Sequence, residues 1–199
     1  MAILTWVGDV DANWNTDNAG DTNWDTNTLP MDGDTLIFDG TGFTLTSNND
    51  TAAGNSYTLQ FTGGEHVISG NSITLDNPDI DITAAFNTIL GMPLNIGADA
   101  MIASSASAVL DISGPIDLGA NLLTVDSAAD GTVSVVIISG GVSGTGDITN
   151  SGGFLVFSEA NTYTGVTTLN SGVLNISADN ALGDVSGNTV FNGGSVRVV

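Results

Sequence analysis

The sequence predicts an all-β protein of short stacked strands, and three observations support this fold class. Helix formers are scarce: lysine is absent, Gln60 is the only glutamine, and Glu65 and Glu159 are the only glutamates. Gly, Asn, Asp, Ser and Thr, which favour turns, recur every few residues. Between them stand short apolar runs that alternate with polar residues and lack the spacing of a helix. A β-solenoid needs this composition, because its coils turn often and enclose branched apolar side chains.

The chain has a formal net charge of −21, from 22 acidic residues and one basic residue, Arg197. An apolar content of 41% and a mean hydropathy of +0.24 argue against a disordered acidic tail. A protein surface with this negative charge repels nucleic-acid phosphates and anionic membranes. We therefore expect no binding to nucleic acid and no membrane insertion, and we expect cations as counterions. The absence of cysteine excludes disulfides and thiolate metal sites.

Residues 1–38 differ from the rest, because they hold all three tryptophans, Trp6, Trp14 and Trp24, among many Asp and Asn residues. The first coil of a solenoid exposes core side chains and unpaired backbone groups. An aromatic lid would cover both, so we expect residues 1–38 to be an N-terminal cap on one continuous domain whose coils occupy 39–199. In the alternative interpretation, Trp14 or Trp24 stacks on a sugar ring.

The cap also offers oxygen ligands for a cation. Asp9, Asp11 and Asp17 alternate with Asn and other residues in a pattern similar to the first half of an EF-hand loop. Trp14 stands where that loop requires glycine and Gly20 where it requires glutamate, so an EF-hand is excluded. We expect the three aspartates to form turns in a polar lid, with a looser Ca²⁺ site at Asp9, Asp11 and Asp17 as the alternative. No cofactor is required.

From Phe43 onward, strands and corners alternate. The expected strands are Thr44–Thr46, Tyr57–Phe61, Val67–Ile68, Ile73–Leu75, Ile80–Ile82, Leu110–Ile112, Ile116–Leu118 and Leu122–Asp126. Residues 84–108 are less regular; we expect further coils there, with a helical turn in 98–108 as the alternative. At roughly 20 residues per coil, residues 40–199 would form about eight coils in a body on the order of 40 Å long.

The most regular segment is Ile138–Ile176. Strands are expected at Ile148, Phe154–Phe157, Thr167–Leu169 and Val173–Ile176, with turns at 144–146, 151–153, 161–165 and 170–172. The run Ala160–Gly165 (ANTYTG), the pair Thr167-Thr168 and the run Gly172–Ile176 (GVLNI) together resemble the autotransporter-associated β-strand repeat of bacterial surface proteins. Asn150 departs from that pattern, because the family often carries lysine there.

The resemblance implies a right-handed parallel β-helix presented outside a bacterial cell. Residues 1–38 are similar to the N-terminal module that precedes such repeats. The chain begins without a basic region or a signal-like apolar run, so we expect a mature segment or fragment of an extracellular or cell-surface protein. We expect Asn161 and Tyr163 to fill a corner that a side-chain hydrogen bond holds, rather than to contact a ligand.

The last coil is expected to lack a cover. Its apolar residues are Val190, Phe191, Val196, Val198 and Val199. We therefore predict self-association through this end, either tail to tail or onto the N-terminal region of another molecule. Surface glycans and other cell-surface proteins are further candidate partners.

Little in the sequence indicates catalysis. Asp79 and Asp81 would share a strand face about 6.6 Å apart, which suits glycoside hydrolysis, although any alternating strand produces such pairs. His66, the only histidine, is expected to be exposed in a Gly-rich corner, and no nucleophile elbow or phosphate-binding loop is present. We predict a non-enzymatic structural or adhesive solenoid. The alternative is a carbohydrate-active module that binds glycans through Trp14 or Trp24, or hydrolyses them weakly.

Overall fold

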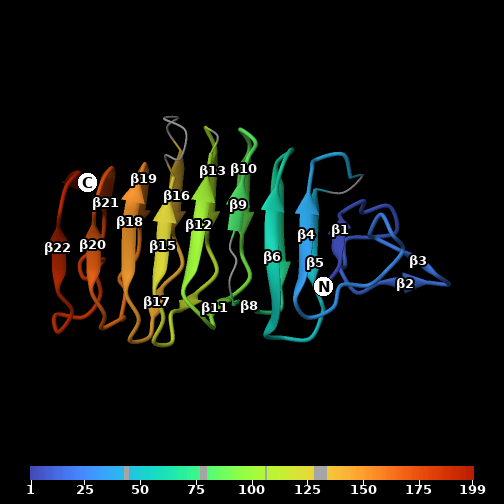
Figure 1. The fold of residues 1–199 in the computed structure, drawn as a ribbon, viewed down its shortest axis with the longest axis horizontal. Coiled ribbons are helices and arrows are strands. Elements are labelled where there is room, and N and C mark those ends of the chain that lie inside the picture. Colours follow the sequence, from blue (N-terminus) through green and yellow to red (C-terminus); the bar gives the residue numbers. More distant parts are fainter. Residues whose placement is uncertain (43–44, 77–79, 106, 128–133) are drawn as a thin grey trace.

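The computed structural model describes residues 1–199 except 43–44, 77–79, 106 and 128–133. In the described part every regular element is a β-strand, and the strands stack as a parallel β-solenoid (Figure 1). The predicted fold class is therefore confirmed. None of these residues forms a helix long and apolar enough to cross a membrane.

Three parallel sheets form the walls of the solenoid. Sheet 1 contains, in stacking order, β1 (Ile3–Thr5), β4 (Asp34–Phe38), β6 (Asn55–Phe61), β9 (Ile80–Ile82), β12 (Ala100–Ser104), β15 (Leu123–Asp126), β18 (Ile148–Gly152), β20 (Thr167–Leu169) and β22 (Thr189–Phe191). Sheet 2 contains β5 (Thr46–Asn49), β7 (His66–Gly70), β10 (Asn87–Leu90), β13 (Val109–Ile112), β16 (Val135–Ile138), β19 (Phe154–Phe157), β21 (Val173–Ile176) and β23 (Ser195–Val198).

Sheet 3 shares β6 with sheet 1. It continues through β8 (Ile73–Leu75), β11 (Leu94–Ile96), β14 (Ile116–Asp117) and β17 (Val142–Ser143). A separate antiparallel pair, β2 (Asp17–Asn18) and β3 (Asp21–Thr22), lies in the cap. The eight stacked strands of sheet 2 correspond to about seven turns, close to the eight coils expected from the sequence.

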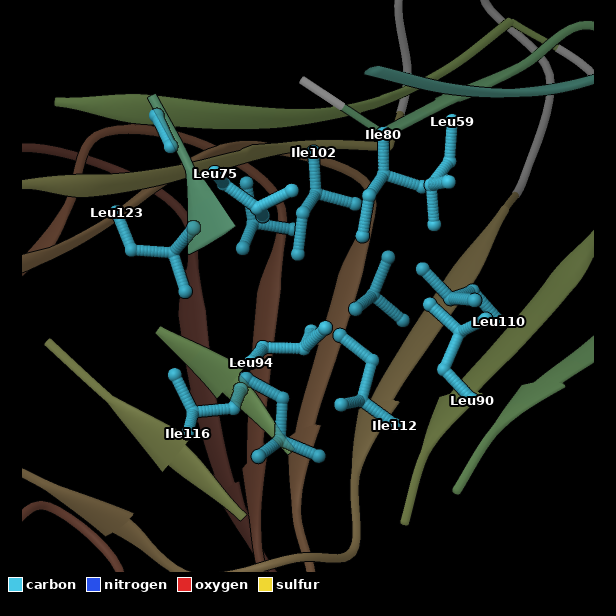
Figure 2. Packing of buried hydrophobic residues seen from close by; sticks show 14 of the residues in the cluster. Leu59, Leu75, Ile80, Leu90, Leu94, Ile102, Leu110, Ile112, Ile116 and Leu123 are labelled. Carbon is cyan, nitrogen blue, oxygen red and sulfur yellow. The ribbon is translucent and has the colours of Figure 1, made fainter. Parts of the chain in front are cut away.

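The core is made of apolar side chains that repeat at the same position in successive coils. Leu90, Ile112, Ile138 and Phe157 pair in register along sheet 2, and all four are buried. Figure 2 shows leucine and isoleucine side chains of the three sheets turned toward one another. Because full burial of such a side chain contributes about 1.5–3 kcal/mol, these repeated positions dominate the stability of the coils.

The strands expected in Ile138–Ile176 are present as β18 to β21. Residues 84–108 also form coils, through β10, β11 and β12, so the alternative of a helical turn is wrong for the described part of this segment. The close stacking of corners in successive coils explains why the last residue of the ANTYTG run, Gly165, is a glycine. A Cβ atom on Gly165 would lie 2.0 Å from the carbonyl oxygen of Gly146 in the previous coil, so only glycine fits there.

Candidate functional site

The cap is an aromatic cluster that closes the N-terminal end of the solenoid. Trp6 and Trp24 meet edge to face, with ring centroids 5.2 Å apart, and Trp14 meets Trp24 in the same way at 5.9 Å. Phe38 of β4 lies within 6.4 Å of all three indole rings and stacks on Phe61 at 5.2 Å. The cluster is therefore continuous with the core of the first coils, as the expected lid would be.

Hydrogen bonds attach this lid to the coil beneath it. The Trp14 indole N–H donates to Ser47 Oγ (3.0 Å), and the Trp14 backbone N–H donates to the carbonyl oxygen of Asn48 (3.0 Å). In return, the Asn48 N–H donates to the carbonyl oxygen of Ala12 (2.7 Å). Because Ser47 and Asn48 belong to β5, the cap covers the first strand of sheet 2.

This burial bears on the sugar-stacking alternative. Trp14 is 0% exposed and Trp24 is 1% exposed, and the Trp24 indole N–H donates to the carbonyl oxygen of Trp14 (2.9 Å). A sugar stacks only on an accessible ring face. Neither indole presents such a face in this structure, so the arrangement offers no glycan contact at these two positions.

The three candidate calcium ligands do not gather into a metal site. Among the residues outside the gaps at 43–44, 77–79, 106 and 128–133, no three His, Cys, Asp or Glu side chains are placed to hold a metal ion. Asp17 instead accepts a hydrogen bond from the N–H of Gly20 (2.8 Å), inside the turn between β2 and β3. Asp9 and Asp11 lie on the loop that precedes Trp14.

Asp11 organises the cap through hydrogen bonds. Its carboxylate accepts from the N–H of Asn13 (2.7 Å), the hydroxyl of Thr16 (2.8 Å) and the amide of Asn23 (2.7 Å). Burial would raise the pKa of Asp11, but these bonds together outweigh it and hold the pKa below its ordinary value of 3.8. The ionised carboxylate thus has a structural role that its sequence position alone did not indicate.

His66 was expected in an exposed corner, and this expectation is wrong. The residue begins β7 and is 1% exposed, with its ring 5.4 Å from Phe38 and 5.9 Å from Phe61. Its Nε2 atom lies 2.9 Å from the carbonyl oxygen of Gly63. Burial lowers the pKa of His66 below its ordinary value of 6.5, although the Gly63 carbonyl and the charge of Asp39 oppose the shift. His66 is therefore a core residue.

The carboxylate pair considered for hydrolysis is only partly described. Asp79 lies outside the described residues. Asp81 is half-buried on β9 between the buried side chains of Ile80 and Ile82, so it points outward as the alternation predicts.

Asn161 and Tyr163 are the expected corner residues, and both are buried. The side-chain oxygen of Asn161 accepts from the N–H of Val142 (2.8 Å), and its amide donates to the carbonyl oxygen of Ala181 (2.6 Å). One asparagine thus joins the coil before it to the coil after it. The Tyr163 hydroxyl bonds to that of Thr167, and burial raises the pKa of Tyr163. The predicted side-chain hydrogen bonds are confirmed.

The last coil, formed by β22 and β23, presents apolar side chains to solvent. Phe191 is 57% exposed and Val198 is 82% exposed, and Val190, Val196 and Val199 are also exposed. Phe191 pairs in register with buried Leu169, and Val196 pairs with buried Leu174, so both occupy core positions. A hollow of about 530 Å³ adjoins this coil and is lined partly by Val198 and Val199. It belongs to the same open end.

Comparison of the chain with models of known protein families, with curated proteins and with solved structures gave no match.

Proposed function

We propose that this chain is a non-enzymatic structural segment of an extracellular or cell-surface bacterial protein, serving as a stalk, scaffold or adhesive surface. The carrying observation is the unbroken stack of strands from β5 to β23, closed by tryptophans at its N-terminal end. Such a stack gains about 4.8 Å of length per coil and repeats its side positions at that interval. The resemblance of Ile138–Ile176 to a repeat of bacterial surface proteins supports the compartment.

The titratable groups with shifted pKa values also favour a structural role. His66 and Tyr163 are buried, and Asp11 and Asp184 each accept a hydrogen bond from the backbone N–H two residues further along the chain. Asp184 accepts from Ser186, which lowers its pKa. Asp11 stabilises the cap and His66 the core, whereas Tyr163 and Asp184 stabilise corners of adjacent coils that a backbone hydrogen bond joins.

The open last coil is the proposed surface for association with a second copy. Phe191, Val196 and Val198 continue the core columns of Leu169, Leu174 and Ile176, so another layer of β-structure would bury them. Residues 185–199 contain no Asp or Glu and include Arg197, so electrostatic repulsion between two acidic molecules is weakest at this end.

A paired carbohydrate assay tests the non-enzymatic proposal. The purified protein is incubated with a panel of polysaccharides, and reducing-end release is measured beside glycan binding. We expect no release of reducing ends. Hydrolysis that Asp81→Asn abolishes, while Asp117→Asn on β14 leaves it intact, would overturn the proposal in favour of a carbohydrate-active module.

A further inference from the structure

The turn that joins β22 to β23 contains an asparagine followed by a glycine. Asn192 and Gly193 lie in this turn, and they form the only Asn-Gly pair of the chain. The side-chain carbonyl carbon of an asparagine is an electrophile, and the backbone nitrogen of the next residue is the nearest nucleophile along the chain. Because glycine has no Cβ atom, nothing beside that nitrogen hinders its approach. This turn therefore combines both reactants of a cyclisation.

The preceding coil has an equivalent corner that differs at the second residue. β20 pairs with β22 and β21 pairs with β23, which places Asn170 next to Asn192 in the stack. Both asparagines are exposed, and Asn170 is exposed although another coil stacks on it. The residue after Asn170 is Ser171, whose side chain hinders the backbone nitrogen. The chain thus carries its own comparison for the reactivity of Asn192.

Stacking on the preceding coil positions Asn192 and requires glycine after it. Asn192 Nδ2 donates to Oδ1 of Asn170 (2.8 Å), and the Asn192 backbone N–H donates to the carbonyl oxygen of Leu169 (2.9 Å). The Gly193 N–H donates to the same carbonyl oxygen at 3.3 Å, which is a longer and weaker bond. A Cβ atom on Gly193 would lie 2.6 Å from the carbonyl oxygen of Asn170. The reactive pair is therefore a consequence of close stacking.

We propose that Asn192 is a site of spontaneous deamidation and that the modification loosens β23. The backbone nitrogen of Gly193 loses its proton to a base in the solvent and attacks Cγ of Asn192. A bond forms between these two atoms and closes a five-membered succinimide, while the bond from Cγ to Nδ2 breaks and ammonia leaves. Water then adds to one of the two carbonyl carbons of the ring and opens it to aspartate or isoaspartate. The net reaction consumes one water and releases one ammonia.

The product differs from asparagine in hydrogen bonding, charge and backbone length. A carboxylate cannot donate to Oδ1 of Asn170 as the amide does. It also introduces a negative charge into residues 185–199, which contain no Asp or Glu. In isoaspartate the chain continues through the side-chain carbon, so the backbone between β22 and β23 becomes one atom longer. Because a change in the length of a connection shifts strand register, the pairing of β23 with β21 weakens.

Ageing of the purified parent protein tests the reaction. Samples are kept at about 37 °C, at about pH 6 and about pH 8.5, since removal of the amide proton by base makes the attack faster at the higher pH. A protease that cuts after acidic residues releases peptides 160–179 and 185–199, and fragmentation mass spectra locate each deamidated asparagine. We expect Asn192 to react about tenfold or more faster than Asn170, which is a barrier lower by about 1.4 kcal/mol. Equal rates at the two asparagines overturn the proposal, as does a rate at Asn192 that is the same at both pH values.

The variant Asn192→Gln is the matched control for the effect on β23. Glutamine keeps the amide group, but its longer side chain must close a larger ring, so this variant should resist ageing. Hydrogen exchange is measured in fresh and aged samples of both proteins. The amides of β23 should exchange about tenfold faster in the aged parent and at the fresh rate in aged Asn192→Gln. Unchanged exchange in a parent that carries isoaspartate at position 192 overturns the proposal. Neither measurement depends on the proposed function, because the reaction involves one molecule.

Discussion

His66 shows how folding can set the charge of a single side chain. In the unfolded chain its pKa is near the ordinary 6.5, whereas burial against Phe38 and Phe61 lowers it in the folded protein. The unfolded state therefore binds a proton first as the pH falls. Stability attached to His66 is complete above about pH 6.5 and decreases as the pH falls from there toward the folded-state pKa.

We therefore expect urea unfolding to show a lower free energy of unfolding at pH 5.5 than at pH 7.5, in part because of His66. His66→Gln should remove that part of the pH dependence. It should also destabilise the protein at both pH values, by about 1–3 kcal/mol, because packing is lost. A pH dependence that is identical in the parent and in His66→Gln would contradict the assignment.

At the scale of the element, the exposed last coil leads to a prediction about self-association. Phe191 and Val198 are exposed core positions, and each would contribute about 1.5–3 kcal/mol when a second copy buries it. The variant Phe191→Lys, Val198→Lys should therefore dissociate any assembly that forms through β22 and β23.

The control for that variant is Thr124→Lys, Thr168→Lys, which changes the charge equally on the outer surface of sheet 1. Electron microscopy and sedimentation velocity would compare the two. Equal association of both variants would show that the end of the solenoid is not the contact.

The same scale shows what the sequence could predict. The strands of Ile138–Ile176 follow from alternation, because every second side chain must enter a narrow apolar core. The same alternation indicates that His66 points inward, because it lies two residues before buried Ile68. The preceding Gly63 and Gly64 instead led to the prediction of an exposed corner. The outward rows of sheet 2 could not be predicted, for another reason. Neighbours along a row, such as Asp111 and Ile137, belong to different coils, and coil lengths vary, so their alignment depends on the folded register.

The candidate site was predicted less well than the fold. The three tryptophans were correctly assigned to a lid, but their full burial depends on Ser47 and Asn48 of the next coil, which hydrogen-bond to Trp14. The sequence identifies Asp11 as a candidate cation ligand. It does not identify the hydrogen-bond partners of Asp11, Thr16 and Asn23, because these depend on the folded conformation of the loop. Contacts between segments that are distant in sequence therefore determine the chemistry of the cap.

At the scale of the whole molecule, the net charge of −21 should make stability depend on salt. Repulsion among 22 acidic side chains opposes the compact state, and added salt screens it. We expect the melting temperature to rise with NaCl concentration. CaCl₂ at matched ionic strength tests the candidate cation site in addition. A further rise that Asp11→Asn removes would support specific binding near Asp9, Asp11 and Asp17. Identical melting curves in NaCl and CaCl₂ would show that calcium acts only by screening the acidic charges.

The contrast between the two ends of the stack has a mechanical consequence. The N-terminal coil is joined by a tryptophan cluster and by backbone bonds to β5, whereas β22 and β23 contact protein on one side only. In a quasi-one-dimensional array, a terminal unit with one neighbour opens before an internal one. In the isolated 199-residue chain, fraying should therefore begin at β23 and move toward the cap, one coil at a time. Amide exchange should be fastest in the last coil and slowest next to the tryptophans. Under tension, the coils would open in the same order, from β23 toward the cap.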